Sequence, residues 1–233
     1  MSIRYIENAR KILCIGRNYA AHIKELNNFA PSQPFFFLKP TSSILKPNSG
    51  PFLVPKGVVV HHEVELAIIL NRELKNLPST FSAEEALECI DGYALSIDMT
   101  ARNVQDEAKK KGLPWSIAKG FDTFLPLSNY IPKEKIPDPY NVELSLSING
   151  EEKQRDLTNL MIFPIHKILS HVSTMMTLEK GDMILTGTPK GVGKVNPGDV
   201  IRATISSDGK LIEDATIEFT AEQKPGPYEF KEI

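Results

Sequence analysis

The chain has 233 residues, of which 41% are hydrophobic and 24% are charged, and both shares are ordinary for a globular protein. The formal net charge of −2 and the lack of a long basic stripe argue against a nucleic-acid partner. No apolar run approaches the roughly 20 residues that span a bilayer, so no membrane partner is expected. Cys14 and Cys89 lie among apolar neighbours and are read as free buried thiols, with a disulfide left open.

Apolar periodicity predicts many short strands and a few short helices. In chain order, strands are expected over residues 11–15, 35–38, 58–70, 92–98, 142–148, 183–186 and 200–205, and helices over 20–27, 82–90, 100–111 and 164–176. Ser82 with Glu85 has the pattern of a capping box, and Gly112 is placed to end a helix. Asn149-Gly150 is typical of a hairpin turn. Strands and helices do not alternate strictly, so we predict a β-rich α+β fold.

Several well-known catalytic motifs are begun but not completed. The glycine-rich stretch 187–194 lacks the Gly-Lys-Ser/Thr ending of a phosphate-binding loop. His61-His62-Glu63 resembles the start of a zinc-protease helix, but Leu66 stands where that motif needs a second histidine. No Gly-x-Ser-x-Gly nucleophile elbow is present. These omissions argue against nucleotide-binding, zinc-protease and serine-hydrolase chemistry.

Three carboxylates form the first candidate site. Glu63 and Glu65 lie two residues apart on an expected strand, so both side chains point to the same face. Such a pair suits a hard ion such as Mg²⁺ or Mn²⁺, although the wet face of an amphipathic strand would give the same pattern. Asp98 ends an apolar strand, where an unpaired buried carboxylate would be costly; its alternative is the N-cap of the next helix.

A histidine–glutamate pair and a lone lysine complete the candidates. His22 and Glu25 share one face of a short helix, so the carboxylate can orient the imidazole and the pair can activate water. A surface ion pair is the alternative. Lys119 lies between apolar and aromatic neighbours, where it either snorkels to solvent or serves as a fixed cation for a substrate carboxylate.

Taken together, six segments resemble the fumarylacetoacetate hydrolase superfamily. They are IGRNY at 15–19, HHEVEL at 61–66, DMTARNVQD at 98–106, KKKGLPW at 109–115, KGFD at 119–122 and LTGTPKGVG at 185–193. The match runs in order over residues 10–205. Six motifs in register support the family more strongly than they support a particular reaction.

The resemblance implies a role for each candidate residue. The metal ligands would be Glu63, Glu65 and Asp98. The metal would be Mg²⁺, with Mn²⁺ as the alternative. The catalytic residues would be His22, Glu25 and Lys119. Further substrate-binding positions would be Arg17, Gln105 and Thr188. His22 and Glu25 match the pair on the family's mobile lid helix, here expected over residues 20–27.

The resemblance also implies the architecture and the setting. We expect one catalytic domain over residues 1–233, with residues 1–10 as an N-terminal extension. Its fold would be the family's β-rich roll with short peripheral helices, assembled as a homodimer. Relatives of this type are largely mitochondrial, so a mitochondrial location is expected, with the cytoplasm as the alternative.

The expected reaction proceeds through an enolate of a small 2-oxo acid, stabilised by the metal and by Lys119. Hydrolysis of the C3–C4 bond of an acylpyruvate and decarboxylation of oxaloacetate come first. Keto–enol tautomerisation of oxaloacetate is the alternative, because it shares the same intermediate. A non-catalytic protein that binds a metabolite is the remaining hypothesis. It predicts that a metal carboxylate or Lys119 would be lost, but all of these residues are present.

Overall fold

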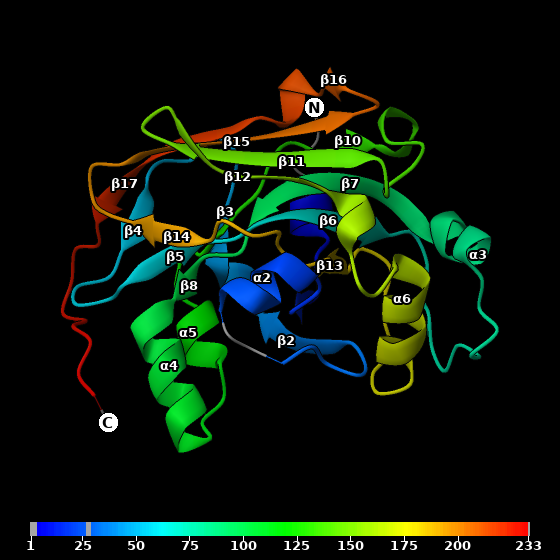
Figure 1. The fold of residues 1–233 in the computed structure, drawn as a ribbon, viewed down its shortest axis with the longest axis horizontal. Coiled ribbons are helices and arrows are strands. Elements are labelled where there is room, and N and C mark those ends of the chain that lie inside the picture. Colours follow the sequence, from blue (N-terminus) through cyan, green and yellow to red (C-terminus); the bar gives the residue numbers. More distant parts are fainter. Residues whose placement is uncertain (1–3, 27–28, 233) are drawn as a thin grey trace.

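Two β-sheets packed on one another form the body of the molecule (Figure 1). The computed structural model describes residues 4–26 and 29–232. The first sheet contains, in order, β10 (Ile131–Pro132), β7 (Ile90–Ile97), β6 (Val64–Leu70), β13 (Met183–Leu185), β1 (Ile12–Gly16) and β2 (Phe35–Lys39). The second contains β12 (Glu151–Leu157), β11 (Val142–Ile148), β15 (Val200–Ser207), β17 (Ile217–Gln223) and β4 (Phe52–Val54), with β16 (Lys210–Leu211) beside β15.

Two smaller sheets lie beside these. One contains β14 (Gly193–Val195), β5 (Val60–His62) and β8 (Thr100–Ala101), and the other pairs β3 (Ile44–Leu45) with β9 (Leu125–Pro126). Most neighbouring strands are antiparallel, whereas β1 and β13 are parallel. The β-rich α+β fold predicted from the sequence is therefore confirmed.

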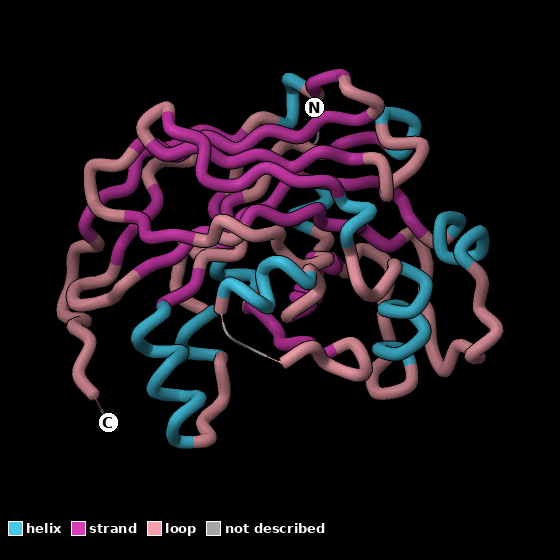
Figure 2. Tube along the Cα trace, viewed as in Figure 1, coloured by secondary structure: helices cyan, strands magenta, loops and turns pink. Residues whose placement is uncertain are grey.

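The helices are short and lie around the sheets (Figure 2). They are α1 (Arg4–Glu7), α2 (Ala20–Glu25), α3 (Ala83–Glu88), α4 (Arg102–Lys111), α5 (Ser116–Lys119) and α6 (Ile165–Ser173). Single 3₁₀ turns cover Thr41–Ser43, Lys133–Lys135, Thr158–Leu160 and Glu213–Ala215. Within the described residues, no helix is long and apolar enough to cross a membrane.

Local sequence signals placed several element ends correctly. The Ser82 hydroxyl accepts the Glu85 N–H at 3.1 Å and the Glu85 carboxylate accepts the Ser82 N–H at 2.7 Å, which is the expected capping box. Gly112 ends α4 with a left-handed φ of 68°. Asn149 and Gly150 both have positive φ and join β11 to β12 as the expected hairpin.

The expected strand over residues 58–70 is wrong in one respect, because it is divided at Glu63. The part before the break, β5, pairs with β14 and β8, whereas β6 pairs with β7 and β13. The chain thus passes from one sheet to another at Glu63. Every residue of β6 is buried, because both faces of its sheet are covered. The wet-face alternative for Glu63 and Glu65 is therefore wrong.

Two helix boundaries also differ from the prediction. The helix expected from residue 100 begins at Arg102, because Thr100 and Ala101 pair with β5 instead. Ala101 is its N-cap, so Asp98 is not a capping residue. The helix expected over 20–27 ends at Glu25, and its expected last residue lies outside the described residues. Cys14 and Cys89 are buried free thiols, as predicted.

Candidate metal and substrate site

Strand pairing brings three carboxylates together at one end of the first sheet. Glu63 lies in the break before β6, Glu65 lies on β6, and Asp98 follows β7, which pairs with β6. The backbone N–H of Asp98 donates to the Glu63 carbonyl at 2.8 Å and holds the end of β7 beside the start of β6. One oxygen of each carboxylate lies within 4.8 Å of the others. We call Glu63, Glu65 and Asp98 the carboxylate cluster.

Three cationic side chains surround this cluster. Lys119 donates to Glu63 at 3.0 Å and to Asp98 at 2.7 Å. Lys39 donates to the other oxygen of Asp98 at 2.6 Å, and Arg102 donates to Glu63 at 2.6 Å. Lys119 is only 1% exposed, so it does not snorkel to solvent. We call Lys39, Arg102 and Lys119 the cation set.

The carboxylates of the cluster differ in their electrostatics. Burial acts to raise the pKa of Glu63, but Lys119 and Arg102 outweigh it and hold that pKa well below its usual range. Burial raises the pKa of Glu65 well above its usual range, and the neighbouring Asp98 and Glu63 raise it further. The Gly187 N–H, at 2.7 Å from Glu65, opposes this shift without cancelling it. Glu65 is thus the carboxyl group that most lacks positive charge.

The donor set fits a divalent cation. Three buried carboxylate oxygens at this spacing form the all-oxygen ligand set that hard ions prefer. A divalent cation would also supply the positive charge that Glu65 lacks. The charge on Lys119 is stable, because Asp98 and Glu63 raise its pKa although burial acts to lower it.

The carboxylate cluster lines a pocket. Its lining includes the three residues predicted as substrate contacts, Arg17, Gln105 and Thr188. Arg17 has a positive φ of 57° and its guanidinium lies 5.9 Å from the centre of the Phe35 ring. Gln105 accepts a hydrogen bond of 2.6 Å from Arg102, which links it to the cluster.

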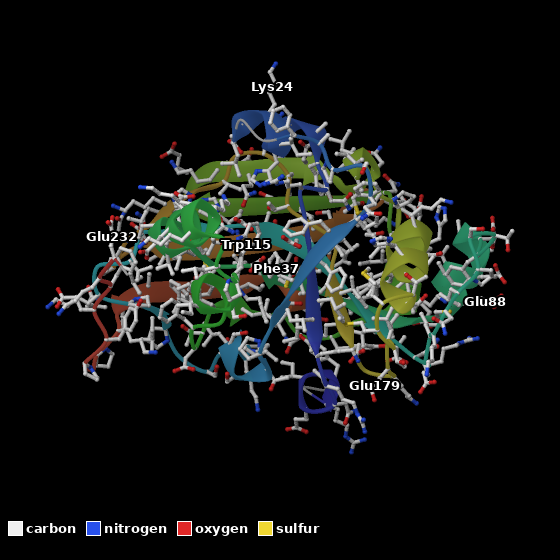
Figure 3. All side chains as sticks on the ribbon, turned by 90° about the horizontal axis from the view of Figure 1, so that it is seen from below. Lys24, Phe37, Glu88, Trp115, Glu179 and Glu232 are labelled. Atoms are coloured by element: carbon white, nitrogen blue, oxygen red, sulfur yellow. The ribbon has the colours of Figure 1, made fainter. Side chains whose placement is uncertain are left out.

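An aromatic wall faces these polar groups. The Trp115 ring meets Phe35 edge-on at 5.2 Å and lies 5.6 Å from Phe37, next to which it appears in Figure 3. Phe37 in turn lies 4.7 Å beneath the Lys119 ammonium group. The rings are half-buried and line the same pocket as the buried carboxylate cluster, and burial of that cluster strengthens its electrostatic interactions.

Helix α2 places the histidine–glutamate pair at this pocket. The Nδ1 atom of His22 lies 3.3 Å from the Glu25 carboxylate, and His22 lines the pocket. His22 is 6% exposed, which does not fit the surface ion pair considered as the alternative. The Glu25 carboxylate also accepts the Gly191 N–H at 3.0 Å, so the helix is held against the glycine-rich loop.

The chain is similar to proteins of a known family. Residues 11–216 match the family described as fumarylacetoacetate (FAA) hydrolase C-terminal. The chain belongs to the fumarylacetoacetate hydrolase family. The resemblance inferred from the six motifs is therefore confirmed, and the β-rich fold is the fold of this family.

Members of the family named for specific reactions are closely similar to the chain. It is 50% identical over 263 aligned residues to "Oxaloacetate tautomerase FMP41, mitochondrial" of Saccharomyces cerevisiae, covering 100% of both chains. It is 49% identical to "Oxaloacetate decarboxylase, mitochondrial" of Dictyostelium discoideum, covering 87% of this chain and 92% of that one. The structure of fumarylpyruvate hydrolase from Pseudomonas aeruginosa with Mn²⁺ and pyruvate superposes with a TM-score of 0.81 at 31% identity, covering 93% and 91%.

Sequence reasoning missed two members of the cation set. Lys39 follows the apolar run of β2, and strand alternation puts it on the same face as Phe35 and Phe37, a signal that could have been used. Arg102 lies within the family motif at 98–106 but had been given no role. The structure places the predicted site residues around one pocket, except that Glu25 does not line it and contacts His22 instead, while their individual roles stay predictions.

Proposed function

We propose that this chain is a metal-dependent enzyme that interconverts the enol and keto forms of oxaloacetate. The observation that carries the proposal is the buried carboxylate cluster, which contacts the cation set and lines the same pocket as His22. The 50% identity to a yeast oxaloacetate tautomerase over the full length of both chains supports this choice among the reactions expected from the sequence.

The charges of the site support a substrate with two carboxylates. With every group ionised, the carboxylate cluster carries three negative charges and the cation set carries three positive charges. A divalent cation would leave the cluster, the cation set and the ion together with an excess of two positive charges, which favours an anion such as the dianion of oxaloacetate. Arg17 and Lys109 also line the pocket and add positive charge that attracts such an anion.

Each of the chain's own residues has a distinct task in this proposal. When bound, the divalent cation supplies Lewis-acid polarisation of the 2-oxo group. Lys119 keeps a fixed positive charge beside the oxygen on which negative charge develops. Glu25 holds the Nδ1–H of His22, which leaves the Nε2 lone pair to carry a proton to or from C3. One proton leaves the enol oxygen and one is added at C3, so the reaction needs no co-reactant.

We further propose Mg²⁺ as the cation, with Mn²⁺ able to replace it, because both suit an all-oxygen site. The Mn²⁺ in the Pseudomonas relative supports the second ion. We also propose a single catalytic domain over residues 1–233, a homodimer and a mitochondrial location. The last follows the names of the relatives from yeast and Dictyostelium.

Decarboxylation of oxaloacetate is the second candidate. The 49% identity to a Dictyostelium oxaloacetate decarboxylase supports it. Loss of CO₂ leaves the enolate of pyruvate, and a divalent cation held by the cluster, together with Lys119, would stabilise its negative charge in the same way. Hydrolysis of acylpyruvates comes next, because His22 and Glu25 could instead activate water, and a fumarylpyruvate hydrolase has the same fold.

The test follows enol absorbance and pyruvate in one oxaloacetate sample with Mg²⁺. We expect faster enol–keto exchange with no pyruvate above the metal-only background, and loss of this acceleration with chelator or in His22→Asn. Pyruvate above background would favour the decarboxylase instead. Neither effect, with folded protein and metal present, would refute both activities; acylpyruvates would then be the substrates to assay.

A further inference from the structure

Gln154 is an exception on an otherwise exposed strand. It is 1% exposed, and it is the buried residue in β12, whose other residues are exposed or half-buried. The pairing with β11 shifts here, because Leu146 faces Gln154 whereas the next residue, Ser147, faces Glu152. Lys153 is therefore the extra residue of a β-bulge. Bulges redirect side chains near functional sites, and this one turns Gln154 inward.

The hydrogen bonds of Gln154 fix which way its amide points. Its Oε1 accepts the Val64 N–H at 3.1 Å, and its Nε2 donates to the Pro189 carbonyl at 2.9 Å. The first partner can only donate and the second can only accept, so the amide has one orientation. The Nδ1 of His62, 2.8 Å from the same Oε1, must then carry its proton. His62 is fully buried, and its Nδ1–H gives the Gln154 Oε1 atom a second donor beside the Val64 N–H.

The same amide controls the predicted substrate contact Thr188. Its Nε2 donates to the Thr188 hydroxyl at 2.9 Å, and that hydroxyl donates in turn to the Val64 carbonyl at 2.9 Å. Thr188 is therefore held between Gln154 and the first residue of β6, one residue before Glu65. The position of Thr188 relative to the carboxylate cluster depends on these two hydrogen bonds.

The bulge also shapes the part of the loop that holds helix α2. Gly191 has a φ of +93°, and a Cβ there would overlap the carbonyl oxygen of Lys153, the bulged residue. A glycine is thus required where the loop passes the bulge. The N–H of Gly191 donates the hydrogen bond that the Glu25 carboxylate accepts. The contact between helix and loop therefore rests on the loop shape that β12 imposes.

We propose that Gln154, fixed by His62, is a positioning residue that holds residues 187–193 in the shape that the site needs. In this role it sets Thr188 at the pocket and presents Gly191 to Glu25 on α2. Gln154 does not line the pocket, and its hydrogen bonds go to residues outside the cluster. The kinetic part of this inference rests on the proposed function, whereas the structural part does not.

Gln154→Met is the test, because methionine nearly keeps the volume and removes all the hydrogen bonds. Thr158→Val is the matched control. Thr158 is also buried, follows the same strand and makes hydrogen bonds to Val142 and Pro139, away from the pocket. Both variants weaken the same hairpin, so a loss of stability common to both does not count toward the proposal.

Amide hydrogen exchange is the readout that needs no activity. In Gln154→Met we expect residues 187–193 and α2 to exchange at least about tenfold faster, because the loop loses its hydrogen bonds at Thr188 and Pro189, and even one net hydrogen bond of about 1.4 kcal/mol changes an opening equilibrium about tenfold. Thr158→Val should leave both segments as in the wild type. Unchanged exchange in Gln154→Met, or an equal change in Thr158→Val, would overturn the proposal whatever the activity assay shows.

Kinetics on oxaloacetate then test the role in the site. We expect Gln154→Met to raise KM with a smaller change in kcat, and Thr158→Val to change neither. His62→Leu should raise KM, because it removes the donor to Gln154. His62→Asn keeps a donor toward Gln154, so its KM should stay close to that of the wild type. Equal KM values for these two His62 variants would refute the role of His62. If the wild type is inactive while the exchange result holds, the proposed function fails and the positioning role stands.

Discussion

Asp98→Asn should be one of the most destabilising shape-conserving substitutions in this protein. Asp98 is 1% exposed and its two oxygens accept from two buried ammonium groups, Lys39 at 2.6 Å and Lys119 at 2.7 Å. An asparagine keeps the shape, but its NH₂ group would face one of the ammonium groups. Lys119 would keep its ion pair with Glu63, whereas Lys39 would keep its hydrogen bond to the Met99 carbonyl and lose its ion pair.

The expected magnitude follows from breaking a buried ion pair at one partner, which costs about 3–5 kcal/mol of unfolding free energy. For a chain of this size each kcal/mol shifts Tm by about 2–4 °C, so Tm should fall by about 6–20 °C. Denaturant unfolding in chelator, at one fixed protein concentration, measures the effect without a contribution from metal binding.

A double variant separates this cause from general damage. In Asp98→Asn combined with Lys39→Met, the stranded ammonium group is gone, so the cost of an uncompensated buried charge at Lys39 is removed. The double variant should therefore recover part of the loss. A single variant within about 1 kcal/mol of the wild type, or a double variant less stable than the single one, would refute the reasoning.

Three further predictions concern the pair on α2, pH and metal. Glu25→Gln should lower kcat/KM about 10- to 100-fold, because a hydrogen bond to a charged group is worth about 1.5–3 kcal/mol; an unchanged value would remove Glu25 from the mechanism. Burial and the nearby Arg102 lower the pKa of His61 to about 4, so the folded state disfavours its charged form. The wild type should lose stability as pH falls from about 6.5 toward 4, and His61→Gln should lose less over that window in parallel denaturant titrations. Oxalate at about 100 times its Kd should stabilise the metal-loaded protein by about 2.7 kcal/mol, with no gain in chelator, as thermal unfolding would report.

Signals carried by neighbouring residues were readable from the sequence. The capping box at Ser82, the αL glycine at position 112 and the Asn149-Gly150 hairpin each depend on a few adjacent residues. The family motifs likewise mark positions whose spacing is fixed within one segment. These features formed as expected because no distant contact competes with them.

Features set by distant contacts were not readable in this way. Glu63 divides an apparently continuous strand, because the segments before and after it pair with different partners. Strand alternation could have placed Lys39 on the face of Phe35 and Phe37, but it could not show that Lys39 contacts Asp98, which lies 59 residues away in the sequence. Gln154 is buried on an otherwise exposed or half-buried strand that the sequence did not predict, next to a bulge in its pairing with β11. In each case, tertiary pairing overrides local preference.

The place of β13 in the first sheet has a consequence for how the chain is made. This strand, Met183–Leu185, lies between β6 and β1, although it follows them by more than a hundred residues. When the first half of the chain has left the ribosome, the strand pairs β1–β2 and β6–β7 therefore lack β13, the strand that lies between them in the finished sheet. Such unpaired apolar edges favour aggregation and need protection while synthesis continues. The loop that caps Glu65 follows directly after β13, so the site is completed only when the chain is nearly finished.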